Sequence, residues 1–173
     1  MADTAPLDAA QLAAYFALME VSSLLQHAVE QQLQTDGGLS YVQFQILARL
    51  NDSPAGQQRM TDLADQIVYS RSGLTYQVGQ LEKGGLVTRR PSVADERSTT
   101  ATITATGRTL LQHVLPGHID LVRQTLLARL SHHDMTTLTR VLGHVRDHMR
   151  AAPPRSAAPR SHRGRGSAAH DTH

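Results

Sequence analysis

The chain has 173 residues, of which 3% are aromatic, and it contains neither cysteine nor tryptophan. The lack of cysteine excludes disulfides, thiolate metal sites and a cysteine redox switch. The formal net charge is only +2 at pH 7, so overall basicity gives no argument for a nucleic-acid partner, and the local pattern has to carry one. The length suits one domain, or one subunit of an intertwined dimer.

No apolar run approaches the roughly 18 residues that span a bilayer, and the chain does not open with a basic segment followed by an apolar one. We therefore expect a soluble, cytoplasmic protein with no membrane partner. Residues 1–58 hold one arginine against six acids, whereas the tail after Arg150 holds four arginines and one aspartate. The acidic first third is expected to face away from any polyanion.

Two helices are predicted in this first third. A long helix from about Asp8 to Gln34 is apolar on two sides, and in so short a chain the second side predicts contact with another subunit. Asp36–Gly38 predicts a loop, after which Ser40 caps a helix over Tyr41–Leu50. Turn-forming residues cluster over 51–56 and predict a second loop.

A short helix and a turn open the middle third. The run Met60–Ile67 has one apolar face, and Thr61 is expected to cap its N-terminus. A turn over Val68–Ser70 follows. The apolar face consists of Leu63, Ala64 and Ile67.

A second helix is predicted over Arg71–Lys83, with Ser70 as its cap. The pair Gly84-Gly85 supplies the left-handed residue at which helices commonly end. Apolar residues recur every three or four positions and predict a buried stripe. These are Leu74, Val78 and Leu81.

The opposite face of this second helix is polar and holds one acid, Glu82, near its end. An ordinary solvated face would favour Glu and Lys, whereas Arg, Gln, Ser and Thr match the edges of bases and phosphates. Gly73 and Gly79 each cost about 1 kcal/mol relative to Ala, and close approach of DNA or close helix packing would explain either. A plain solvated face is the alternative. The expected DNA contacts are Ser70, Arg71, Ser72, Thr75, Tyr76, Gln77 and Gln80.

A β-hairpin is predicted next. Leu86–Pro91 reads as one strand and Thr100–Thr104 as the alternating return strand. At the tip between them, Arg97 is expected to enter a minor groove, with Asp95 holding its guanidinium or capping the turn. A surface ion pair is the alternative for these two residues. Arg89 and Arg90 are expected to touch phosphates or to stay solvated. Helix, turn, helix and hairpin together are the plan of a winged helix-turn-helix, which places its second helix in a DNA groove.

These segments carry a resemblance to a known family. The ungapped run Leu63–Val87, the wing pattern from Asp95 through Arg97 to Ile103, Thr104 and Gly107, and the run Leu39–Leu47 resemble the MarR (multiple antibiotic resistance regulator) family of bacterial transcription factors. The likeness covers about residues 10 to 150. Val68 departs from it, because many members carry glycine in this turn. The resemblance implies a homodimer that represses or activates genes and is often released by a small molecule.

The resemblance also implies an effector cavity between the dimer helices and the winged region. Each candidate for its lining is also a reasonable core residue, and nothing in the sequence identifies a compound. The candidate effector-binding residues are Tyr15, Met19, Tyr41, Phe44 and His113.

Two further helices complete the predicted fold. One runs from Ala105 to about Leu130, with Arg108 in its first turn as a phosphate contact or a solvated side chain. Pro116 inside this helix predicts a kink or a break. The last helix starts near Ser131 and has a two-heptad apolar seam, too short for an autonomous coiled coil, which predicts packing against a symmetry mate. The seam residues are Met135, Leu138, Leu142, Val145 and Met149.

The histidines raise the question of a metal or an active site. His144 and His148 have a metal-compatible spacing, but Asp147 lies on another helix face and no third ligand is evident. His113 and His118 are expected either to sense a ligand or metal, or to be exposed. No nucleophile elbow, phosphate loop or HExxH motif is present. We therefore expect no enzyme activity, no cofactor and no metal.

The predicted fold class is mainly α with a small β-hairpin wing, a winged helix-turn-helix flanked by N- and C-terminal dimerisation helices. The predicted function is a DNA-binding regulator, a repressor, that binds a palindromic operator as a homodimer and is released by a small molecule. A protein-binding winged-helix scaffold and a constitutive regulator without an effector are the alternatives. The expected regions are a flexible N-terminus (1–7), supporting and dimerisation helices (8–58), the DNA-binding region (59–107), C-terminal dimerisation helices (108–150) and a disordered basic tail (151–173).

Overall fold

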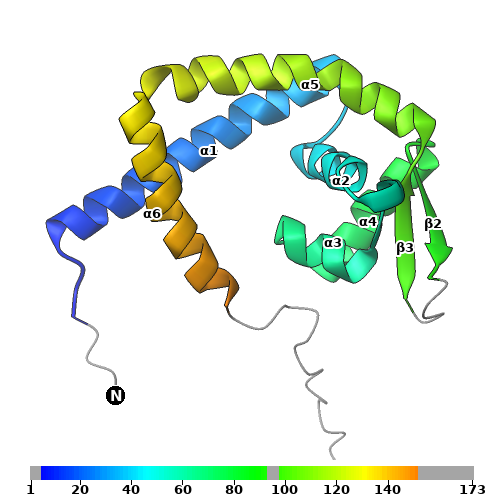
Figure 1. Ribbon diagram of the computed structural model, residues 1–173, viewed down its shortest axis with the longest axis horizontal. Coiled ribbons are helices and arrows are strands. Elements are labelled where there is room, and N and C mark those ends of the chain that lie inside the picture. The colour runs from blue at the N-terminus through cyan, green and yellow to red at the C-terminus, as the bar shows by residue number, and fades with distance from the viewer. Residues whose placement is uncertain (1–4, 93–97, 152–173) are drawn as a thin grey trace, which may run out of the picture.

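The computed structural model describes residues 5–92 and 98–151. Within these ranges the chain forms six α-helices, two short 3-10 turns and a three-stranded antiparallel sheet (Figure 1). The helices are α1 (Ala9–Gly37), α2 (Tyr41–Asn51), α3 (Met60–Ile67), α4 (Arg71–Lys83), α5 (Ala105–Thr125) and α6 (His132–Arg150), and the strands are β1 (Gln57–Arg59), β2 (Val87–Pro91) and β3 (Thr99–Ile103). The predicted class, mainly helical with a small β wing, is confirmed.

The apolar core joins the C-terminal half of α1 to α2, α3, α4, the sheet and the start of α5. The predicted inner faces are confirmed, since Leu63 and Ala64 of α3 are buried and so is the stripe of α4. Few aromatic residues are available, so aliphatic side chains fill this space. The largest fully buried ones include Leu33, Ile46, Leu47, Leu50, Leu63, Leu74 and Leu81.

The starts of α2 and α4 follow their predicted caps. Ser40 forms a capping box with Gln43, and the hydroxyl of Ser70 accepts from the Gly73 amide at 3.2 Å. The end of α1 differs from the prediction, because the helix continues through Asp36 and stops only at Gly38, where φ is +63°. The predicted loop is shorter as a result, since the left-handed glycine ends the helix and the aspartate does not.

The sheet has one strand more than the predicted hairpin. β2 and β3 pair antiparallel, as expected, and β1 pairs with the other edge of β3, with Gln57 opposite Thr102 and Arg59 opposite Thr100. The three residues of β1 are all polar, so they lack the alternation of apolar and polar residues that predicts a strand. Only the pairing with β3 reveals β1. Thr104, predicted as the last strand residue, instead caps α5 by accepting from the Gly107 amide at 3.0 Å.

Strand β1 also explains why the predicted cap of α3 is wrong. The N-cap position belongs to Arg59, whose side chain makes no capping bond. Thr61 lies inside the first turn, and its hydroxyl is 3.2 Å from a carboxylate oxygen of Asp62. Because pairing with β3 keeps the backbone extended up to Arg59, the helix begins before the threonine.

A kink or a break was predicted at Pro116; helix α5 is continuous through this residue, so no break occurs, and the helix changes direction along its length (Figure 1). It packs along α1, and Gln32 of α1 donates to the carbonyl of Val114 at 3.2 Å, two residues before the proline. These tertiary contacts offset the backbone bond that proline removes. The helix ends at Thr125, ahead of a 3-10 turn over Leu127–Arg129.

The N-terminal half of α1 is apolar and exposed. Over an 18-residue window of α1 the mean hydropathy is 1.2, so by length and composition alone this helix passes the test for a membrane span. Only 6% of that window is buried. The expectation that no segment reaches that length is therefore wrong, because the alanines between the larger apolar residues keep the average high. Helices of soluble proteins pass the same test, and the large apolar side chains here remain uncovered within one protomer. They are Leu12, Tyr15, Phe16, Leu18, Met19, Val21 and Leu24.

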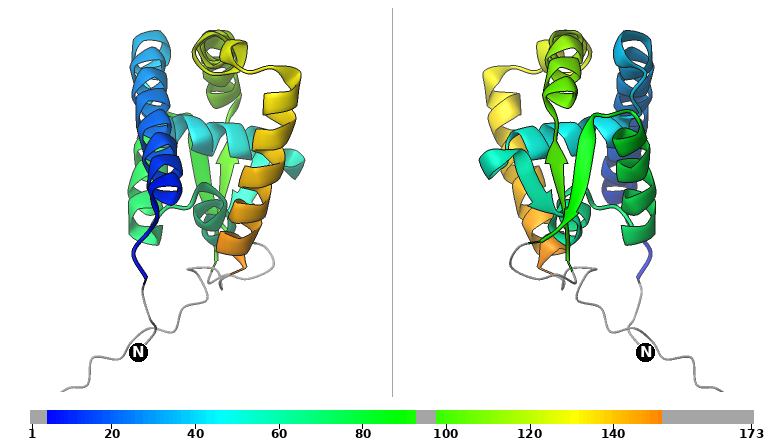
Figure 2. Two further views of the ribbon diagram at one scale, coloured as in Figure 1. Left: turned by 90° about the vertical axis from the view of Figure 1, so that its left-hand side faces the viewer. Right: turned by 90° about the vertical axis from the view of Figure 1, so that its right-hand side faces the viewer.

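Helix α6 folds back from the end of α5 and runs toward the helix-turn-helix (Figure 1), so that α1 and α6 lie on opposite flanks of the protein (Figure 2). Its last residue, Arg150, donates to the carbonyl of Gln66 in α3 at 3.3 Å. Four of the five predicted seam residues of α6 are solvent-exposed, from 36% at Leu142 to 72% at Met149, and Met135 is partly exposed. An apolar stripe left uncovered on this scale marks an interaction surface.

The turn between α3 and α4 contains a strained residue. Val68 has φ +57° and ψ +46° and is 58% exposed. The left-handed conformation costs an L-residue about 1–2 kcal/mol, while glycine adopts it freely but has more chain entropy to lose. Val68→Gly should therefore raise the free energy of unfolding by about 1 kcal/mol, measured by urea denaturation. Ala55→Gly, also at positive φ (+54°) but without β-branching, should gain less. A loss of stability in Val68→Gly would contradict this reading of the turn.

Candidate DNA interface

Helix α4 presents a polar side to solvent. Its inner residues are buried, whereas Arg71, Ser72, Thr75 and Tyr76 are exposed and Gln77 and Gln80 are partly exposed. Tyr76 is 63% exposed, which is unusual for so large a side chain unless it has a partner to meet. The structure thus places the predicted contact residues of this helix on one accessible surface.

The hydrogen-bonding groups on this surface are largely available. Within the part of the chain that the structure describes, the amides of Gln77 and Gln80 and the hydroxyl of Tyr76 have no intramolecular hydrogen bond. Thr75 donates its hydroxyl hydrogen to the Arg71 carbonyl at 2.9 Å, which leaves its oxygen free to accept. Free amides can bond bidentately to adenine, the commonest use of glutamine in a major groove.

The two glycines of α4 differ in whether internal packing requires them. A Cβ on Gly73 would lie 2.6 Å from the ring of Tyr69 and 2.8 Å from the Ser70 hydroxyl, so packing of the turn requires a glycine there. A Cβ on Gly79 would meet nothing closer than a guanidinium nitrogen of Arg89 at 4.0 Å. Packing therefore explains Gly73 and leaves Gly79 without an internal reason.

The acid on α4 has an internal partner. The Arg89 side chain of β2 donates to Glu82 through Nε at 2.9 Å and Nη2 at 2.5 Å, and its backbone amide donates at 3.1 Å. The bonds from Arg89 hold the pKa of the Glu82 carboxyl below its usual value. Arg89 was expected to contact phosphate or to stay solvated, and it is instead paired. Arg90 remains exposed.

We expect Glu82→Gln to lower the thermal midpoint at pH 7, because the charge-assisted bonds to Arg89 weaken. A carboxyl with a depressed folded pKa stabilises the fold above its ordinary pKa, and that contribution is lost as pH falls through the folded value. The midpoints of wild type and variant should therefore converge below about pH 4. Asp120→Asn removes an ion pair to Arg123 (2.6 Å) that both partners expose to solvent and should change the midpoint less. A constant difference from pH 7 to pH 3 would contradict the role of the Glu82 charge.

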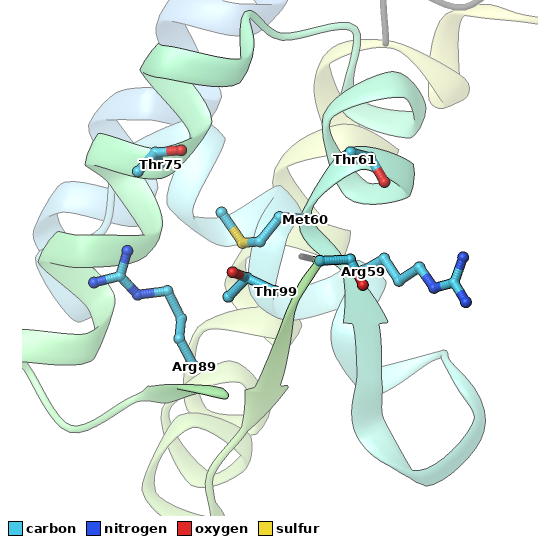
Figure 3. A pocket seen from close by; sticks show the side chains of 7 residues that line it. Arg59, Met60, Thr61, Thr75, Arg89 and Thr99 are labelled. Carbon is cyan, nitrogen blue, oxygen red and sulfur yellow. The ribbon is translucent and has the colours of Figure 1, made fainter. Parts of the chain in front are cut away.

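A hollow of about 450 Å³ lies between the start of α3, the outer side of α4 and the wing strands (Figure 3). Arg89 reaches into it toward α4, whereas the guanidinium of Arg59 points to the opposite side (Figure 3). Sequence reasoning missed this set, since its signal is the pairing of β1 with β3. The lining residues are Arg59, Met60, Thr61, Thr75, Arg89, Ser98 and Thr99.

The remaining basic candidates are placed as follows. Arg108 donates to the Asn51 side chain at 2.8 Å, which joins the start of α5 to the end of α2, so this residue is neither simply solvated nor reserved for phosphate. Asp95 and Arg97, the predicted wing contacts, lie outside the described residues, as does the basic tail after residue 151.

The candidate effector residues are only partly brought together. A cavity of about 330 Å³ lies between α1, α2 and α5, and Tyr41 lines it. Phe44 is buried and packs on His118, a lining residue, with ring centroids 4.6 Å apart. Tyr15 and Met19 belong to the exposed half of α1, and His113 is exposed on α5. The full lining is Ser22, Leu25, Gln26, Val29, Tyr41, His118 and Val122.

No cluster of three or more His, Asp or Glu side chains that could hold a metal occurs among the residues the structure describes. The carboxylate of Asp134 has its own explanation, since it completes the capping box of α6 with Ser131. Bonds from the Ser131 hydroxyl and amide lower the pKa of the Asp134 carboxyl.

Comparison with known proteins agrees with this geometry. A model of the MarR family matches residues 37–98. The chain is 27% identical over 139 residues to the HTH-type transcriptional repressor YetL of Bacillus subtilis (strain 168), covering 80% of this chain and 82% of that protein. It is 31% identical over 108 residues to the HTH-type transcriptional regulator MhqR of the same organism, covering 62% of this chain and 72% of that protein.

A solved structure of similar fold has been determined with DNA. Sco3205, a MarR family transcriptional regulator from Streptomyces coelicolor crystallised in complex with DNA, aligns with a TM-score of 0.81 and 32% identity, over 86% of this chain and 92% of that one. A helix-turn-helix places its second helix in the major groove, and α4 is the second helix of this unit here. The chain is a member of the MarR family of transcriptional regulators.

Proposed function

We propose that this protein is a repressor that binds a palindromic operator as a homodimer and is released by a small molecule. The observation that carries the proposal is the outer side of α4, where the amides of Gln77 and Gln80 stand free of internal bonds within the described chain. The DNA complex of Sco3205 supports a duplex as the partner, and the repressor YetL supports the direction of control. The protein acts in the cytoplasm, where its operator is.

The DNA-contacting surface extends beyond α4. Residues 59–107 form the DNA-binding region, with Ser70 at the head of α4, Arg97 as the minor-groove contact, and Asp95 holding its guanidinium or capping the turn. Gly79 has no packing reason, so close approach of the DNA backbone accounts for it. Arg59 is an added phosphate candidate, because its exposed side chain adjoins the uncapped start of α3.

The second copy is held by the terminal helices, residues 8–58 and 108–150. The exposed apolar sides of α1 and α6 are too large for a monomer surface. A two-fold dimer presents two α4 helices about one DNA turn apart, so two half-sites should be separated by ~10 bp. The scaffold alternative gains no support, since the free amides of α4 suit base edges.

The effector is proposed to occupy the cavity between α1, α2 and α5. These helices join the dimer region to the winged region, so a ligand there favours one spacing of the two α4 helices over another. A ligand that binds both spacings equally would not release DNA. A constitutive regulator is the alternative, and release assays with added compounds distinguish the two.

The test of the proposal is DNA binding by the full chain. Fluorescence anisotropy with the duplex upstream of its own gene should show binding that tightens as salt falls, with a linear dependence of log affinity on log salt. A scrambled duplex of equal length is the control, and it should bind at least about a thousand-fold more weakly at physiological salt. Failure to bind any duplex at low salt would refute DNA binding, and a monomer in sedimentation would refute the dimer.

A further inference from the structure

Four polar residues, Ser22, Gln26, Tyr41 and His118, line the cavity between α1, α2 and α5, and among them His118 has a buried ring nitrogen without a hydrogen-bond partner in the described chain. Leu25, Val29 and Val122 are the cavity's apolar lining residues, and His118 lies one turn before Val122 on the same side of α5. At about 330 Å³ the space is at the small end of ligand pockets, which suits a molecule with a single ring.

The two ring nitrogens of His118 differ in access. Nδ1 is shielded from solvent and has no hydrogen-bond partner in the described chain, and the ring packs against Phe44. Nε2 is not among the shielded atoms. Burial lowers the pKa of His118, so the imidazole is neutral at pH 7. A buried acceptor without a partner costs less than a buried N–H without one, which assigns the proton to Nε2.

The charges around the cavity disfavour an anion. None of its lining residues carries a formal charge when His118 is neutral. The carboxylate of Glu30 accepts the backbone amide of Tyr41, a lining residue, at 2.6 Å and so adds negative potential beside the cavity. A carboxylate ligand would lose its water with no cation in return.

We infer that this cavity takes a small uncharged molecule that carries a hydrogen-bond acceptor oxygen, and that His118 Nε2–H donates to that oxygen. The inference rests on the proposed effector cavity and names the class of compound it selects. The apolar wall binds the ring, and His118 discriminates between compounds by what they present to it.

Three matched probes test this on the full-length protein without DNA. Acetophenone carries a carbonyl oxygen, ethylbenzene has the same ring and nearly the same shape without an acceptor, and benzoate replaces the neutral carbonyl with an anion. Ligand-detected NMR titration at pH 7.5 should give the tightest binding for acetophenone, by roughly five-fold over each of the others, the effect of one hydrogen bond. Equal binding of acetophenone and ethylbenzene, preference for benzoate, or no binding of any probe would overturn the inference.

Variants assign the preference to one atom. His118→Gln keeps an N–H donor near the place of Nε2 and should keep the order of the three probes. His118→Met keeps the bulk without the donor and should bind acetophenone and ethylbenzene equally. His113→Met, an exposed histidine on the same helix, is the control and should behave as wild type. Unchanged discrimination in a folded His118→Met protein would overturn the assignment.

A second readout separates this inference from the proposed function. Anisotropy of the operator complex is measured while each of the three probes is titrated up to saturation. Discrimination by His118 with no loss of operator affinity would refute release by an effector at this cavity and leave the ligand class standing. Loss of operator affinity with all three probes alike would support release and overturn the selectivity.

Discussion

Leu142→Glu should abolish the proposed dimer and, with it, tight operator binding. Leu142 lies in the apolar seam of α6, where it is 36% exposed in the protomer. Two-fold symmetry would bring two new carboxylates into one apolar interface, and each buried unpaired charge costs several kcal/mol. We expect the dimer dissociation constant to rise by at least about a hundred-fold, measured by sedimentation velocity across a concentration series.

The matching control is Thr136→Glu, which introduces the same residue on the side of α6 away from the seam, where Thr136 is exposed. It should leave both association and the circular dichroism spectrum unchanged. A monomer also has only one α4 helix for two half-sites, so Leu142→Glu should bind the full operator no better than an isolated half-site. A dimeric Leu142→Glu protein would show that α6 is not the interface.

Gln77→Ala should weaken operator binding by about 1–3 kcal/mol and relax the preference at one base position, if its amide bonds to a base edge. Gln77 is partly exposed on α4 and has no hydrogen bond in the described chain, so its truncation should leave stability nearly unchanged. Anisotropy against the operator and a set of single-position substitutions measures both quantities. When the contacted base is substituted, the wild-type protein should lose affinity for the duplex, and the variant should not.

Gln124→Ala, an exposed glutamine near the end of α5, controls for the loss of an amide elsewhere. It should bind every duplex as wild type does. A uniform loss across all sequences in Gln77→Ala would demote Gln77 to phosphate positioning. An unchanged affinity for the operator would remove it from the interface.

Several features of this protein could be predicted from interactions between residues close together in the sequence. Ser40 and Ser70 predicted two helix starts, because a hydroxyl at an N-cap satisfies first-turn amides without help from distant residues. The spacing of Leu74, Val78 and Leu81 predicted which side of α4 is buried, and by exclusion which side is presented. The DNA-facing set on α4 follows from these two observations and remains a prediction until binding is measured.

Other features needed the assembled chain. Strand β1 exists because β3 offers an edge to Gln57–Arg59, and that pairing moved the start of α3 ahead of Thr61. Arg89 was expected to contact phosphate or to stay solvated. In the structure its guanidinium donates to Glu82, seven residues earlier in the chain. The break expected at Pro116 is absent because α1 packs beside it and Gln32 donates to α5.

The sequence by itself determined the helical periodicities, the caps of α2 and α4 and the polar composition of α4, since these depend on neighbours within four residues. Only the tertiary structure decided which charges are already paired, where the third strand lies and which histidine nitrogen remains accessible. The physical reason is distance along the chain. Strand pairing and burial bring together residues that are far apart in sequence. A hydrogen bond or a desolvation cost depends on which groups are close in space.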